Sequence, residues 1–167
     1  MSLSEDLLAG ESMHPIDIVE TLAEHRAWEF DRVTDDQIAM AVEGQWRTYS
    51  LTLAWTASDE TLRLICTFEM EPPEERLEAL YETLNRTNDI SWAGAFTFWH
   101  EQRLMVWRYG LMLAGGQLAS PEQIDRMIAA AVQGAERFYP AFQLVAWSDS
   151  SPEAALQVAI AEAYGRA

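Results

Sequence analysis

Two stretches near the middle of the chain alternate between apolar and polar residues. The first covers residues 48–56 and the second covers residues 61–70. A period of two is typical of a β-strand with one packed face and one largely wet face. The apolar positions are Tyr49, Leu51, Leu53, Trp55, Leu62, Leu64, Cys66, Phe68 and Met70. Residues 57–60, Ala-Ser-Asp-Glu, predict the turn of a hairpin between the two strands.

Two further strands are predicted upstream, at residues 28–34 and 37–43. Asp35 and Asp36 form the turn between them, and Gly44 permits the next turn.

The stretch from Asn85 to Gly116 predicts a second hairpin. Asn, Asp and Ser residues end a helix, and an apolar run with Trp92, Phe96 and Phe98 at spacing two follows. After a polar break, a second apolar run ends at a pair of glycines. We expect a β-hairpin that leaves a helix and carries aromatic side chains along one face.

Helices are predicted before, between and after these strands. The first starts near Pro15, where a proline fits because its missing N–H would be unpaired there anyway. The second follows Pro72 and Pro73, and its expected inward face is Leu77, Leu80, Tyr81 and Leu84.

Two more helices follow the aromatic hairpin. Residues 120–123, Ser-Pro-Glu-Gln, have the spacing of a capping box, and Pro140 is expected to kink or end the helix that they open. A last helix runs from Pro152 to Gly165.

The order of elements predicts an α+β domain, with a twisted antiparallel sheet that has helices on one face. A single domain is expected at residues 14–167, after a mobile tail at residues 1–13. Leu3, Leu7 and Leu8 of this tail can form a short apolar stripe.

Composition narrows the class of protein. The chain has 167 residues with 49% hydrophobic content and seven tryptophans, which argues against disorder. No apolar run is long enough to span a bilayer, and the acidic start does not resemble a signal peptide. The single cysteine, Cys66, has no internal partner for a disulfide. These features predict a cytoplasmic protein.

The net charge limits the kinds of partner that the protein can bind. Eleven basic residues, all arginines, stand against 27 acidic residues, for a net charge of −16. Such a field repels nucleic-acid backbones, so we expect no nucleic-acid partner. The acidity suits either solubility or attraction to a basic partner, and the sequence leaves both open.

The sequence shows no pattern for catalysis or metal binding. His14, His25 and His100 lie far apart, without ligand spacing. Cys66 falls on the inward face of a strand, where it is expected to act as a small hydrophobe. The acidic residues gather in turns and helix starts, where they have structural roles. We predict no catalytic, cofactor-binding or metal-binding residues.

The aromatic hairpin offers candidate interface residues. Trp99 points to one face of the sheet, whereas Trp107 and Tyr109 share a face of the partner strand. One face must be core, and the other exposes aromatic rings unless a helix of this chain or a partner protein covers it. Trp99, Trp107 and Tyr109 are therefore candidate protein-interface residues.

Several of these segments together resemble the YbjN family over residues 15–164. The resemblance rests on Asn85 before the hairpin, Gly-Ala-Phe at residues 94–96, Arg108 with Tyr109, Leu-Ala-Gly-Gly at residues 113–116, and the Ser-Pro-Glu-Gln helix start. It implies the fold of type III secretion chaperones, a curved antiparallel sheet against helices that is often dimeric. It also implies a role in regulation, and it supplies no catalytic residues.

The leading hypothesis is a cytoplasmic, non-enzymatic protein-binding module, chaperone-like or regulatory, with an unidentified protein client. Six antiparallel strands leave two edges, so we expect two copies to pair through the sheet and its aromatic hairpin. One alternative is a small-ligand sensor that holds an effector between sheet and helix. An enzyme of unknown chemistry is a third possibility.

Overall fold

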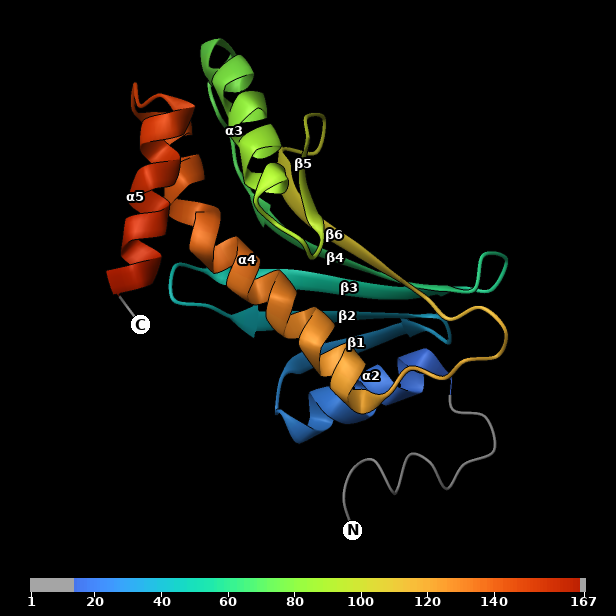
Figure 1. The fold of residues 1–167 in the computed structure, drawn as a ribbon. Coiled ribbons are helices and arrows are strands. Elements are labelled where there is room, and N and C mark those ends of the chain that lie inside the picture. The colour runs from blue at the N-terminus through green and yellow to red at the C-terminus, as the bar shows by residue number, and fades with distance from the viewer. Residues whose placement is uncertain (1–13, 166–167) are drawn as a thin grey trace.

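A six-stranded antiparallel sheet forms the centre of the computed structural model, which describes residues 14–165 (Figure 1). The strands are β1 (Glu29–Thr34), β2 (Gln37–Glu43), β3 (Thr48–Thr56), β4 (Thr61–Glu69), β5 (Ala95–Trp99) and β6 (Leu104–Met112). They lie in the order β1-β2-β3-β4-β6-β5. The predicted tail at residues 1–13 lies outside the described residues.

The predicted alternation in β3 and β4 is confirmed. Leu51 lies opposite Cys66 and Leu53 lies opposite Leu64. All of the predicted inward residues of these two strands are buried except Trp55, which is half-buried. Because side chains alternate across a strand, the polar and small residues between them fall on the opposite face.

The second hairpin does not join the sheet in chain order. β6 pairs with β4 along its whole length, and β5 pairs only with residues 104–108 of β6. β4 and β6 have nine residues each, whereas β5 has five. The shorter strand therefore takes the edge of the sheet, and the end of β6 runs past it.

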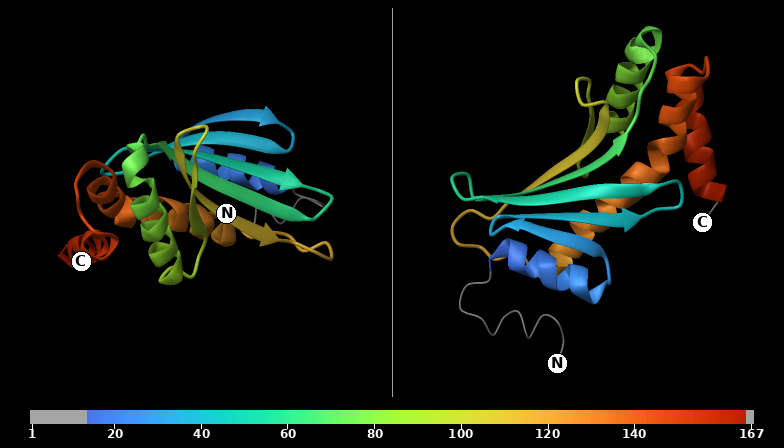
Figure 2. Two further views of the ribbon diagram at one scale, coloured as in Figure 1. Left: turned by 90° about the horizontal axis from the view of Figure 1, so that it is seen from above. Right: turned by 180° about the vertical axis from the view of Figure 1, so that it is seen from behind.

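The helices pack on one face of the sheet. They are α2 (Pro15–His25), α3 (Leu77–Asp89), α4 (Pro121–Trp147) and α5 (Pro152–Gly165), with a 3-10 turn at Glu74–Arg76. α2 and α4 cover the strands directly, and α3 and α5 pack beside the far end of α4. Seen from behind, the strands lie in front and α4 lies beyond them (Figure 2). The predicted fold class, α+β with a curved antiparallel sheet against helices, is confirmed.

The predicted start of α4 is confirmed by a capping box. The Ser120 hydroxyl accepts a hydrogen bond from the backbone N–H of Gln123, and the Gln123 side chain accepts one from the backbone N–H of Ser120. These bonds satisfy N–H groups that have no partner within the helix.

Pro140 does not end α4, which continues to Trp147. The residues beyond the proline are held by packing, since Phe142 is fully buried and its ring lies 5.1 Å from that of Phe96. The expected packing of residues 142–147 is confirmed. The sequence predicts either a kink or a helix end at Pro140. The helix end is excluded, because tertiary contacts outweigh one missing backbone donor.

The buried face of α3 differs from the prediction at Tyr81, which is exposed. Thr83 and Thr87 are buried in its place. Their hydroxyls donate to the carbonyls of Ala79 and Thr83, at 2.7 and 2.8 Å. Because these hydroxyls are satisfied within the helix, they can face the core at little cost.

Trp92 also lies elsewhere than predicted. The sequence places it on one strand face with Phe96 and Phe98, but β5 starts only at Ala95. Trp92 is fully exposed in the turn before the strand. The positive φ of Gly94, 69°, redirects the chain there, so the period of two does not extend back to Trp92.

Candidate binding surfaces

The face of the sheet that points away from the helices carries mostly small or polar side chains. Ala39, Ala41, Ser50, Thr52, Ala54, Thr61 and Thr67 lie on it. None of the described helices covers it (Figure 2). This face is thus free of helix cover over the described residues, although Val106 of β6, which lies on it, is fully buried among its neighbours.

Trp99 and Arg108 stand on this open face. They line a hollow of about 620 Å³ over β4, β5 and β6, together with Arg63 and Ile65. Trp99 is half-buried and Arg108 is exposed. No carboxylate lines this hollow, although Arg63 is paired with Asp59 at 2.7 Å. The surface therefore combines an aromatic ring with positive charge on an acidic protein.

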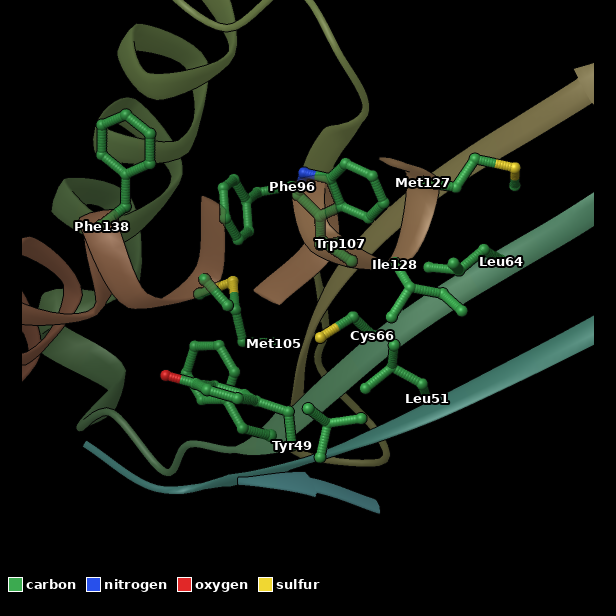
Figure 3. Packing of buried hydrophobic residues seen from close by; sticks show 14 of the residues in the cluster. Tyr49, Leu51, Leu64, Cys66, Phe96, Met105, Trp107, Met127, Ile128 and Phe138 are labelled. Carbon is green, nitrogen blue, oxygen red and sulfur yellow. The ribbon is translucent and has the colours of Figure 1, made fainter. Parts of the chain in front are cut away.

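Trp107 and Tyr109 lie on the opposite face, toward α4. Trp107 is 2% exposed and stacks on the half-buried Tyr109, with ring centroids 6.1 Å apart. Figure 3 shows Trp107 between Phe96 and Met127. The structure thus separates the three predicted interface residues: Trp107 and Tyr109 lie on the helix-covered face, and Trp99 lies on the open one.

Two glycines make room for the Trp107 indole. A Cβ at Gly94 would overlap the ring, and one at Gly134 of α4 would approach the indole nitrogen to 3.3 Å. The ring therefore fits because neither position carries a side chain.

A cavity of about 550 Å³ lies between β6 and α4, beside Trp107. Its lining includes Tyr109 and Leu111 from β6, and Arg126 and Met127 from α4. It borders the part of β6 that runs past the end of β5. The alternative hypothesis, an effector held between sheet and helix, requires a cavity in this position, and the structure has one.

The edge strand β5 is partly closed by a side chain of α3. Asn88 donates to the backbone carbonyl of Phe96 at 3.0 Å and accepts from its N–H at 2.7 Å. The Asn88 amide thus makes both bonds that a neighbouring strand would make at Phe96.

Cys66 lies in the core, as predicted, and is 1% exposed. Burial raises the pKa of its thiol from 9 to about 12. The neutral thiol therefore predominates near neutral pH, and a thiolate nucleophile is disfavoured.

The histidines and acids remain dispersed. His14 contacts Asp36 at 2.7 Å, and His100 contacts Glu74 at 3.3 Å. Within residues 14–165, no three His, Cys, Asp or Glu side chains gather as a metal site would need. Over the same residues we find no helix long and apolar enough to cross a bilayer.

Sequence reasoning missed three polar residues that the fold brings into use: Asn88, Arg108 and Arg126. Arg108 could have been placed beside Trp99, because the hairpin register puts both on one face. Asn88 contacts a strand eight residues further along the chain, and Arg126 lines a cavity with residues of a distant strand. The sequence carries no local signal for either position.

Comparisons with known proteins address the family. Residues 15–144 match the model of the YbjN family, whose description reads "Putative bacterial sensory transduction regulator". The crystal structure of YbjN from E. coli aligns with a TM-score of 0.53 and 11% identity, over 88% of this chain and 93% of that chain. A chain from the HopA1-SchA chaperone-effector complex aligns with a TM-score of 0.44 and 14% identity, over 70% and 88%. No curated protein matches the chain.

Proposed function

Since the chain belongs to the YbjN family, whose model matches residues 15–144, we propose that it is a regulatory protein-binding module without enzymatic activity. The open sheet face around Trp99 is its contact surface, it pairs there with a second copy, and it works in the cytoplasm. A protein client binds the assembled dimer. The observation that carries the proposal is the uncovered hollow over β4, β6 and β5.

The chemistry of this surface supports a protein partner. Trp and Arg are enriched in protein interfaces and dominate their binding energy when buried at the centre. Here Trp99 and Arg108 border one hollow whose floor includes the half-buried Ile65. An aromatic ring, an arginine and an aliphatic floor form a suitable anchor for a second protein surface.

The edge of β5 supports contact through the face rather than through strand addition. Asn88 already occupies the backbone groups of Phe96. A partner strand would have to displace this amide before it could pair along β5. The face carries no such obstacle.

Charge modulates the pairing. Two copies at −16 repel each other, but the lining of the hollow contains no carboxylate. Salt screens the remaining repulsion over about 8 Å at physiological strength. Pairing is therefore expected to strengthen as salt rises from low to moderate concentration.

Sedimentation equilibrium at micromolar concentration tests the pairing. We expect a dimer at moderate salt, and Trp99→Ala is expected to weaken it by about 2 kcal/mol or more, the loss typical of a central anchor. Trp147→Ala is the matched control, because Trp147 is exposed at the far end of α4.

Two results would contradict the proposed dimer. One is a monomer of 18.9 kDa at both salt concentrations. The other is equal weakening by Trp99→Ala and Trp147→Ala, which would place the contact away from the open face.

A further inference from the structure

The cavity between β6 and α4 exists because β5 is short. β5 begins at Ala95 opposite Arg108, so residues 109–112 of β6 have no strand on that side. Across from them, α4 presents the small side chains Ala129 and Ala130. A long strand and a helix face with small residues leave a space of about 550 Å³, within the range of small-molecule sites.

One wall of the cavity is apolar and flat. The stacked rings of Trp107 and Tyr109 are inclined by 13° to each other, and Leu111 extends the same strand face. Met127 faces them from α4. Flat aromatic surfaces of this kind favour a planar apolar body, which can stack on them.

The other wall brings a cation. Arg126 is exposed at the cavity and forms no ion pair, hydrogen bond or ring contact with residues 14–161. Most other described arginines are engaged, for example Arg26 with Asp125 and Arg32 with Asp17 and Glu20. Glu122, four residues before Arg126 on α4, also lines this cavity. A guanidinium that forms no ion pair with a described residue is still the group at the cavity rim that can contact an anion.

We propose that this cavity binds a small amphipathic anion with a planar apolar body and one acidic group. The body lies against the half-buried ring of Tyr109, which stacks on the buried Trp107, and Arg126 contacts the acidic group. Gln133, about two helical turns beyond Arg126 on α4, also lines the cavity. The site lies on the helix-covered face, away from Trp99, so it does not depend on the proposed dimer.

A matched pair of fluorescent probes tests both parts of the site. The anionic probe is 1-anilinonaphthalene-8-sulfonate, and the neutral probe is N-phenyl-1-naphthylamine, which has the same aromatic body without the sulfonate. We expect the intact chain to bind both with one site per chain. Arg126→Gln is expected to weaken the anionic probe about threefold to tenfold and to leave the neutral probe unchanged.

Two further variants locate the site. Ala130→Phe places a ring in the cavity and is expected to abolish binding of both probes. Arg137→Gln removes the same charge from the same helix outside the cavity lining, and is expected to change neither affinity. Circular dichroism confirms folding of each variant, and Ala129→Met serves as a second filling variant if Ala130→Phe does not fold.

Three outcomes would overturn the proposal. Equal loss of the anionic probe in Arg126→Gln and Arg137→Gln would mean that net charge, rather than Arg126, governs binding. Unchanged binding in a folded filling variant would place the probes elsewhere. The third outcome is that the unsubstituted chain binds neither probe while the Leu7→Asp variant binds both. This result would mean that the apolar N-terminal segment, rather than a small anion, occupies the cavity.

Discussion

At the residue scale, the position of Trp107 depends on a missing side chain. The indole is 2% exposed, and the backbone of Gly94 approaches it so closely that a Cβ would overlap the ring. Gly94 also has a φ of 69°, a conformation that costs other residues free energy. Two separate effects therefore require glycine at this position.

A pair of glycine variants separates these effects. Gly115 has a φ of 76° but no atom near its would-be Cβ. Gly115→Ala is expected to lower the free energy of unfolding by about 1 kcal/mol through backbone strain alone. Gly94→Ala is expected to cost about 1–3 kcal/mol more, because it also overpacks the core against Trp107. Urea unfolding measures the free energy of unfolding of both variants. Equal losses would mean that the Trp107 ring shifts to make room for the added Cβ at no cost in stability.

The buried thiol of Cys66 predicts a fall in stability at alkaline pH. Its pKa is about 12 in the folded chain and about 9 when exposed, so the unfolded chain releases the proton first as pH rises. Stability is complete below pH 9 and is lost toward pH 12, by at most about 1.4 kcal/mol per pH unit. Urea unfolding of the protein and of Cys66→Ala at pH 8 and pH 10.5 measures this difference.

In that comparison the stability of the unsubstituted chain is expected to fall more steeply than that of Cys66→Ala. Tyr49 also has a raised pKa, caused first by burial and then by its hydrogen bond to Glu136. Tyr49 is present in both proteins, and the main cause of its shift, burial, precedes the smaller contribution of Cys66, so most of its effect cancels. Parallel pH profiles would show that the thiol is not shielded in the folded state.

At the element scale, one carboxylate joins α4 to the turn between β2 and β3. Glu136 accepts hydrogen bonds from the Tyr49 hydroxyl at 2.6 Å and from the backbone N–H groups of Gln45 and Trp46 at 2.8 and 3.2 Å. Gly44 permits the approach, because a Cβ there would overlap the carboxylate. The turn thus binds a side-chain anion much as a helix N-terminus binds one.

Removing this charge is expected to loosen α4 from the hairpin. Glu136→Gln keeps the size of the side chain but weakens three hydrogen bonds, with an expected loss of about 1–3 kcal/mol in urea unfolding. Glu78→Gln, an exposed acid of α3, is the control, with an expected change within about 0.5 kcal/mol. A double variant with Tyr49→Phe is expected to be non-additive, since the two residues share one bond. Additive losses would contradict a joint role.

The elements themselves could be predicted from the sequence wherever one physical rule decided them. β3 and β4 follow from an alternation that only Ile65 breaks, and the start of α4 follows from Ser120 and its capping box. Prediction failed where two rules competed. Pro140 opposed the packing of Phe142, and the buried hydroxyl of Thr83 displaced Tyr81 from the core.

At the scale of the whole molecule, the sequence predicts the layers but not the pairing of the last hairpin. Periodicity shows that strands have one packed face and that helices cover it, which is what the structure has. It does not show that β6 lies between β4 and β5, since strand order depends on contacts between distant segments. The cavity and the separation of Trp99 from Trp107 both follow from that order. The candidate surfaces could therefore be identified only from the structure.

The Asn88 amide has a consequence for how such a chain can vary. A strand at the edge of a sheet is a template for uncontrolled growth into aggregates, and proteins protect such edges with charges, prolines or covering elements. Here a helix covers the edge through one side chain that imitates a strand. Few other side chains offer a donor and an acceptor in that geometry. Substitutions at position 88 are thus limited by aggregation through the β5 edge as well as by folding. A homologue without an amide at this position needs another feature that blocks strand pairing at β5.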